Sequence, residues 1–233
     1  MKFMNENMTV IVIALGALGC YQFLILSPVL RTWFLRKFGA ANFSLSWHLF
    51  ERLTGALLIG ISSIICYLLG SESKILDHPF LLNRSVAWIS IVSIILMITM
   101  AAASTAFAHG NAGYPQIKTG QWHLSLILVN ALAWFAYLLP YEFLLRGILF
   151  SAFLNITGIA AAIMFNIVIY AAIHFHKPRK EMLGCLPFGI LLCIITLFTR
   201  SLVPAIIIHS SMAVSFDSAG IFYQLKTFKP SLS

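Results

Sequence analysis

The chain has 233 residues, of which 60% are hydrophobic and only 9% are charged, whereas soluble globular domains contain about 25% charged residues. The formal net charge is +8, but the basic residues lie in short segments between apolar runs, which is typical of membrane topology signals and not of a nucleic-acid-binding module. Composition therefore excludes a soluble domain and predicts an all-α, polytopic transmembrane helix bundle, with residues 1–233 forming a single membrane-embedded domain.

Seven apolar runs approach or exceed the length needed to cross a bilayer as a helix, about 20 residues. The first run is too long for the apolar core of a signal peptide, about 7–15 residues, so we interpret it as a true span. The first three spans, within residues 1–121, carry no recognisable chemical motif and are interpreted as accessory spans. In chain order the runs cover residues 8–30, 53–70, 86–108, 122–155, 159–174, 186–199 and 203–223.

The fourth run is too long for one straight span, and it contains Pro140. It can be two spans that turn at the proline, giving eight in all, or one long tilted helix that is kinked there. The stretch "YLLPYEF" has no Gly, Asn or Asp with which to reverse direction. An eighth span would also move the basic cluster at residues 177–180 to the outside, against the positive-inside rule. We therefore predict seven spans, with the N-terminus outside and the C-terminus in the cytoplasm, and keep eight as the alternative.

Ionisable side chains are rare within these runs, and each costs about 2.5–3.5 kcal/mol to insert into hydrocarbon. Such residues usually face the bundle interior, where they find partners or carry function. A purely structural role is the competing interpretation, for example an ion pair that only fixes helix packing. The residues in question are Glu142, Arg146, His174, His209 and Asp217, with Asn130 and Asn166 as neutral companions.

Glu142 and Arg146 are four residues apart, so they share one helix face and can neutralise each other. His174 ends the fifth run, and Tyr170 lies one turn before it on the same face. One carboxylate and two imidazoles on separate helices can activate a water molecule and stabilise an oxyanion. This chemistry predicts hydrolysis in a water-poor interior.

The same side-chain types also bind zinc, but the arginine beside Glu142 disfavours that carboxylate as a metal ligand. The sequence has no HExxH motif and no GxSxG motif, and its four cysteines form no CxxC pair. We therefore expect no cofactor, with a divalent metal such as zinc as the less favoured alternative.

Three motifs, "YEFLLRG" at 141–147, "YAAIH" at 170–174 and "IIIHSSMA" at 206–213, resemble those of a known family. They are similar, in order and membrane setting, to the EExxxR, FxxxH and HxxxN motifs of the CPBP family (CAAX protease and bacteriocin-processing, or Abi). These intramembrane glutamic-type endopeptidases are related to the type II CAAX prenyl endopeptidase. The resemblance covers about residues 132–217, which we interpret as a CPBP-like catalytic-type core.

The resemblance implies a role for each matching residue. Glu142 would activate water, Arg146 would be its electrostatic partner, His174 would assist in activation, and His209 would stabilise the oxyanion. The remaining polar residues near these motifs are expected to bind substrate. They are Tyr141, Tyr170, Asn166 and Asp217.

Two positions depart from the family pattern. Tyr141 occupies the position of the first glutamate, the proposed water-activating base, and a tyrosine with an ordinary pKa near 10 is a poor base at neutral pH. Ala213 occupies the position of the asparagine in the oxyanion region. Catalysis would then depend on Glu142, or activity would be lost.

The sequence thus predicts an intramembrane endopeptidase that cleaves a membrane-associated protein or peptide. The alternatives are a non-catalytic CPBP-like protein that binds membrane peptides or acts in immunity, and a small transporter that uses the buried charges as a relay. Expected partners are the lipid bilayer and the peptide substrate, without nucleic acid, and the expected location is a bacterial plasma membrane. CAAX specificity is not assumed.

Overall fold

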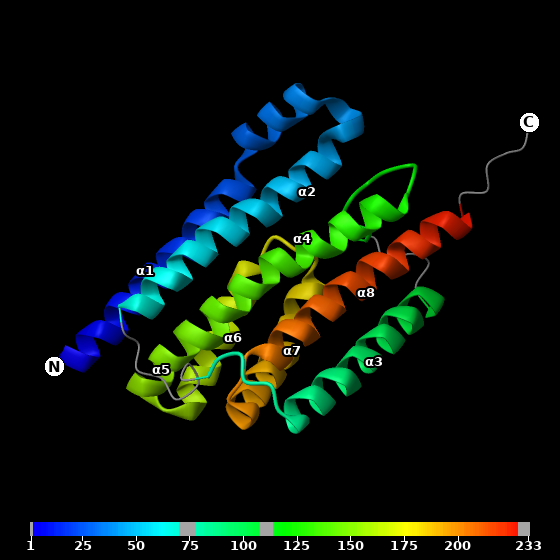
Figure 1. Cartoon of the computed structure of the whole chain (residues 1–233). Helices are drawn as coiled ribbons and strands as arrows, with labels where there is room; N and C mark the ends of the chain where they lie inside the picture. Colours follow the sequence, from blue (N-terminus) through cyan, green and yellow to red (C-terminus); the bar gives the residue numbers. More distant parts are fainter. Residues whose placement is uncertain (1, 70–77, 108–113, 228–233) are drawn as a thin grey trace, which may run out of the picture.

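The computed structural model describes residues 2–69, 78–107 and 114–227, and no strand occurs in these ranges. Figure 1 shows the helices running alongside one another, with the two ends of the described chain at opposite ends of the bundle. The helices are α1 (Lys2–Leu26), α2 (Pro28–Leu68), α3 (Arg84–Phe107), α4 (Leu124–Glu142), the π-helix η1 (Phe143–Leu149), α5 (Phe150–Thr157), α6 (Ile159–Ile173), α7 (Arg179–Thr199) and α8 (Val203–Thr227).

The predicted fold class is confirmed, because the described chain is an all-helical, multi-pass membrane bundle. Six helical segments in the described ranges are long and apolar enough to cross a membrane, and α4, η1 and α5 together count as one of them. The predicted fifth span forms α6, which is apolar but only 15 residues long. The predicted sixth span, 186–199, is longer than expected because α7 begins at Arg179 and includes the basic residues before it.

The fourth apolar run does not turn at Pro140. Helix α4 continues through the proline into η1 and then α5, so the chain crosses once where the eight-span alternative needs two crossings. Proline removes one backbone donor, but it does not end this helix, which lies among neighbouring helices that can compensate for the loss. The π-helical turn that follows Pro140 is of a kind that is frequent at functional sites.

The first predicted span, 8–30, crosses a helix boundary. Helix α1 ends at Leu26, and Ser27 caps α2 by accepting a hydrogen bond from the backbone N–H of Leu30 at 3.3 Å. Pro28 is suited to the first turn of a helix because its missing N–H would have no partner there. Gly39 then has a φ of 71°, and α2 bends at this residue into two arms.

The second arm of α2 packs closely against α4. A Cβ atom at Gly55 would lie only 2.5 Å from the ring of Tyr137, so glycine permits this approach. Tyr21 of α1 packs on the same ring, with 5.6 Å between centroids. The two N-terminal helices therefore form one wall of the polar centre of the bundle.

Candidate active site

A buried ion pair lies at the junction of α4 and η1. Glu142 and Arg146 are both 0% exposed, and Arg146 Nη1 donates to Glu142 Oε1 at 2.9 Å. The guanidinium also lies over the ring of Tyr170 from α6, 4.4 Å from its centroid. The shared helix face predicted from the spacing is therefore confirmed, and the arginine is held by a second helix.

His209 from α8 joins this pair. Its Nδ1 lies 2.5 Å from Glu142 Oε1, so one carboxylate oxygen contacts both the imidazole and the guanidinium of Arg146. A carboxylate ionised beside an arginine only accepts hydrogen bonds. Nδ1 must then carry a proton, and in the neutral imidazole Nε2 is an acceptor. Nε2 lies 3.5 Å from the hydroxyl of Tyr170.

His174 lies immediately after α6, with its Nδ1 2.9 Å from the backbone carbonyl oxygen of Tyr170. Because a carbonyl only accepts, Nδ1 is the protonated nitrogen of this ring and Nε2 is an acceptor. Burial lowers the pKa of His174 to about 3, so the ring is neutral at ordinary pH. His174 and His209 thus each present an unprotonated nitrogen.

Tyr141, which replaces the first glutamate of the family motif, lies beside His209 with their ring centroids 5.8 Å apart. The side chain is 1% exposed, and its hydroxyl has no hydrogen-bond partner among the described residues. A buried hydroxyl without a partner is unusual. It is available to donate to a group that enters from outside the protein.

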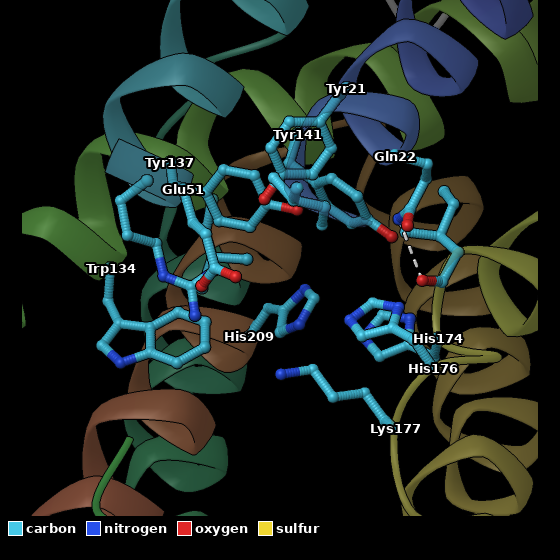
Figure 2. Close-up of a pocket in the computed structure, with 14 residues that line it drawn as sticks. Tyr21, Gln22, Glu51, Trp134, Tyr137, Tyr141, His174, His176, Lys177 and His209 are labelled. Carbon is cyan, nitrogen blue, oxygen red and sulfur yellow. Dashed lines mark hydrogen bonds between the residues drawn. The ribbon is translucent and has the colours of Figure 1, made fainter. Parts of the chain in front are cut away.

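A cavity of about 60 Å³ is lined by Tyr141, His174 and His209, and Figure 2 shows the two histidines facing into it. One water needs about 10–15 Å³ on such a measure, so the cavity admits several. Glu142 and Arg146 do not line it, but Glu142 contacts His209, which does. The lining residues are Tyr21, Gln22, Ile25, Glu51, Arg52, Trp134, Tyr137, Leu138, Tyr141, Ile173, His174, His176, Lys177 and His209.

Asn166, predicted to bind substrate, is 0% exposed and does not line the cavity. Its Nδ2 donates to the backbone carbonyl of Leu145 in η1 at 2.6 Å, and its Oδ1 accepts from Cys193 Sγ of α7 at 3.3 Å. Asn166 therefore ties α6 and α7 to the π-helical turn that carries Arg146.

Asp217, also predicted to bind substrate, lies on α8 outside the cavity lining and is 0% exposed. Its Oδ2 accepts from Trp134 Nε1 at 2.7 Å and from Asn130 Nδ2 at 3.0 Å. Its Oδ1 accepts from the backbone N–H of Gln116 at 2.7 Å. The structure thus brings six of the eight predicted residues into one cluster near Glu142, while Asn166 and Asp217 hold the surrounding backbone and side chains.

The N-terminal helices contribute more to the site than the sequence indicated. Tyr21 and Gln22 of α1 and Glu51 and Arg52 of α2 line the cavity, and the interpretation of the first three spans as accessory stays a prediction. Gln22 Nε2 also donates to the backbone carbonyl of Ile173, joining α1 to the end of α6 at 2.9 Å. The two charges directly before the second apolar run were the available signal, but charges at span ends are ordinary topology features.

No group of three or more His, Cys, Asp or Glu side chains suited to hold a metal ion occurs in the described ranges. The expectation that no cofactor is needed stays a prediction.

Comparison with known families gives a match over residues 121–215, to the family model described as type II CAAX prenyl endopeptidase Rce1-like. The matched segment contains Glu142, Arg146, His174 and His209 and begins just before α4. The comparisons with curated proteins and with solved structures found no match. The resemblance inferred from the three short motifs is therefore confirmed.

Proposed function

We propose, from the match of residues 121–215 to the Rce1-like family of type II CAAX prenyl endopeptidases, that the protein is an intramembrane endopeptidase. One observation carries this proposal. A buried relay runs from Arg146 through Glu142 to His209, and it ends at a cavity large enough for several water molecules. Carboxylate, imidazole and water in this order form a general-base arrangement that recurs in hydrolases on unrelated folds.

The arrangement favours a division of roles different from the one implied by the family motif. Glu142 contacts His209 and does not line the cavity, so we assign His209 as the group that takes the proton from water. Glu142 orients the imidazole and stabilises the imidazolium that forms, and Arg146 holds the carboxylate in place. His174 has a low pKa and is therefore a weak base. We assign it a different role, in which its unprotonated Nε2 accepts a hydrogen bond from the same water and orients it.

In the first step, His209 Nε2 accepts a proton from water as the water oxygen bonds to the carbonyl carbon of the scissile peptide. The carbonyl oxygen becomes an oxyanion, and the unpartnered hydroxyl of Tyr141 is placed to donate to it. This gives the substituting tyrosine a function that does not require it to act as a base.

In the second step, the carbon–nitrogen bond breaks and the proton on His209 Nε2 passes to the departing nitrogen. The products are a new carboxylic acid and a new amine, and His209 returns to its starting tautomer. The acid then gives its proton to the amine or to water and becomes a carboxylate. One water is consumed, and no redox partner is needed.

We propose that the substrate is a membrane-associated protein or peptide, and we leave open whether it is prenylated. Arg52 and Lys177 line the cavity, and under the positive-inside rule such basic residues favour a cytoplasmic position for this end of the bundle. The proposed location is a bacterial plasma membrane with the N-terminus outside.

The test is cleavage in reconstituted membranes. Purified protein is incubated with membrane proteins from cells that lack it, and new peptide termini are identified by mass spectrometry. We expect new termini with the wild type and none with His209→Ala or Glu142→Gln. His123→Ala is the matched control, because His123 is an exposed helix cap outside the cavity lining.

Identical termini from the wild type and His209→Ala would contradict the proposal. If the wild type produces no new termini, including with membrane proteins from other sources, the result would favour a non-catalytic peptide-binding protein.

A further inference from the structure

The cavity contains a buried cation that the proposed mechanism does not use. Arg52 of α2 is only 6% exposed and lines the cavity. No Asp or Glu within residues 2–69, 78–107 and 114–227 forms an ion pair with it. Its Nε also lacks a hydrogen-bond partner there. A buried charge normally has a partner of opposite sign, because an unpaired one is costly to bury.

The guanidinium of Arg52 is held in place by neutral groups. It lies over the ring of Trp134 at 3.6 Å from the centroid, and its Nη2 donates to Gln116 Oε1 at 2.7 Å. Asp217 holds both supports, since it accepts from Trp134 Nε1 and from the backbone N–H of Gln116. Asp217 thus positions Arg52 without neutralising it by direct contact.

A second cation, Lys177, lines the same cavity from the segment between α6 and α7. Burial and the neighbouring positive charge of Arg52 lower the pKa of Lys177. Figure 2 shows its ammonium group directed toward the space in front of His209. The two cations therefore act on one region of the cavity.

One acidic residue lines the same cavity. Glu51 lines the cavity, but its Oε1 accepts a hydrogen bond from Trp47 Nε1 at 2.8 Å on its own helix. Burial lowers the pKa values of His174 and His176 to about 3 and about 4, so both are neutral near pH 7. The residues that line the cavity thus include two cations and one carboxylate, so the lining has a net positive charge beside the proposed base. Two carboxylates outside the lining, Glu181 and Asp217, favour the charged form of Lys177.

We infer that Arg52 and Lys177 form a subsite for a carboxylate of the peptide substrate, so that this protein selects peptides with a negative charge near the cleaved bond. The inference rests on the proposed endopeptidase function for the identity of the ligand as a peptide. In an unmodified peptide the carboxylate is either the chain end or an Asp or Glu side chain. Arg52 suits such a ligand because its planar guanidinium pairs well with carboxylates.

The test is binding of matched apolar peptides to the full-length protein in lipid nanodiscs, measured by fluorescence anisotropy. One pair of peptides has a free or an amidated C-terminus, and a second, amidated pair has a single Asp or Asn. We expect the charged member of one pair to bind about tenfold more tightly than its neutral match. The pair that shows this gap identifies the source of the carboxylate.

Variants assign the gap to the subsite. Arg52→Gln is expected to abolish the difference in affinity between the charged and the neutral peptide. Arg52→Lys is expected to keep part of this difference, and Lys177→Gln to reduce it. Glu51→Gln is expected to widen it, because it removes the opposing charge. Lys180→Gln is the matched control, since Lys180 is exposed and does not line the cavity.

Thermal unfolding of each variant separates loss of the subsite from loss of the fold. Because Lys177 lies outside the helices, Lys177→Gln tests the subsite without altering a helix. Equal binding of charged and neutral peptides, binding of neither, or a gap that survives Arg52→Gln would overturn the inference. Mass spectrometry of the recovered peptides keeps the two proposals distinct. If charged peptides bind more tightly but none is cleaved, only the endopeptidase proposal is refuted. If peptides are cleaved but charged and neutral ones bind equally, only the subsite inference is refuted.

Discussion

Replacing Glu142 with glutamine removes the two functions that one oxygen atom has in this structure. Glu142 Oε1 accepts from Arg146 Nη1 at 2.9 Å and contacts His209 Nδ1 at 2.5 Å. Glutamine has nearly the same shape, but it has no charge and its amide nitrogen is a donor. If the amide nitrogen faces His209, it donates to Nδ1, and the imidazole proton moves to Nε2, where the lone pair is needed.

The expected loss of activity is large. In the serine-protease triad, the equivalent exchange lowers kcat by about 10⁴-fold because it fixes the wrong tautomer, and we expect about 10³–10⁴-fold here. The variant also leaves Arg146, which is 0% exposed, as an unpaired buried cation. Breaking a buried pair in this way costs about 3–5 kcal/mol. Glu142→Gln should therefore lower the thermal stability as well, whereas His209→Gln keeps the ion pair and loses mainly activity.

The assay combines initial rates of peptide cleavage in proteoliposomes with thermal unfolding in detergent. Because Glu142 and His209 act as one unit in this mechanism, the double variant should be no slower than the slower single variant. The reasoning is refuted if Glu142→Gln keeps activity within tenfold of the wild type. It is also refuted if the fold losses in cleavage rate of the two single variants multiply in the double variant, since that would indicate independent roles.

Three further variants test the surrounding groups. Tyr141→Phe should lower kcat by about 10²–10³-fold with little change in KM, as for the loss of one oxyanion donor, and kinetics with unchanged kcat would exclude this role. Asn166→Ala should lower the free energy of unfolding by about 1–3 kcal/mol, because the carbonyl of Leu145 loses its buried donor, and chemical unfolding that matches the wild type would contradict this. His174 has a pKa near 3 when folded and about 6.5 when unfolded, so the unfolded state binds the extra proton and stability should fall as pH drops from 6.5 toward 3. His174→Gln should flatten that pH dependence of Tm, and parallel curves for variant and wild type would refute the assignment.

Much of the fold could be predicted from the sequence, because each apolar run has to satisfy its own backbone as a helix in hydrocarbon. The helix through Pro140 was predictable for the same reason, since "YLLPYEF" has no residue that favours reversal. The boundary after Leu26 was missed because Ser27 and Pro28 interrupt the helix within one continuous apolar run. Apolar composition determines where a chain can lie in the membrane, but it does not determine where one helix ends and the next begins.

The composition of the site was also largely predictable, whereas the order of its parts was not. Glu142, Arg146, His174 and His209 are conspicuous because ionisable groups are rare in apolar runs. Which of them faces the cavity depends on how α8 is rotated against α4, and that rotation is set by packing among all the helices. The spacing within a motif therefore identifies a carboxylate and an imidazole, but it does not determine which one contacts the water.

The two buried arginines show why packing decides function in this bundle. Arg146 has its carboxylate four residues away on the same helix, so local sequence accounts for its charge. Arg52 has no such partner, and its supports come from Trp134 on α4 and from Gln116 before it. A cation that the protein has paired serves to hold Glu142 against His209. A cation that the protein positions but does not pair is instead available to a ligand, and Arg52 lies in the wall of the cavity that His209 also lines. The N-terminal helices would then supply the selection of substrate, and the family-like segment would supply the chemistry.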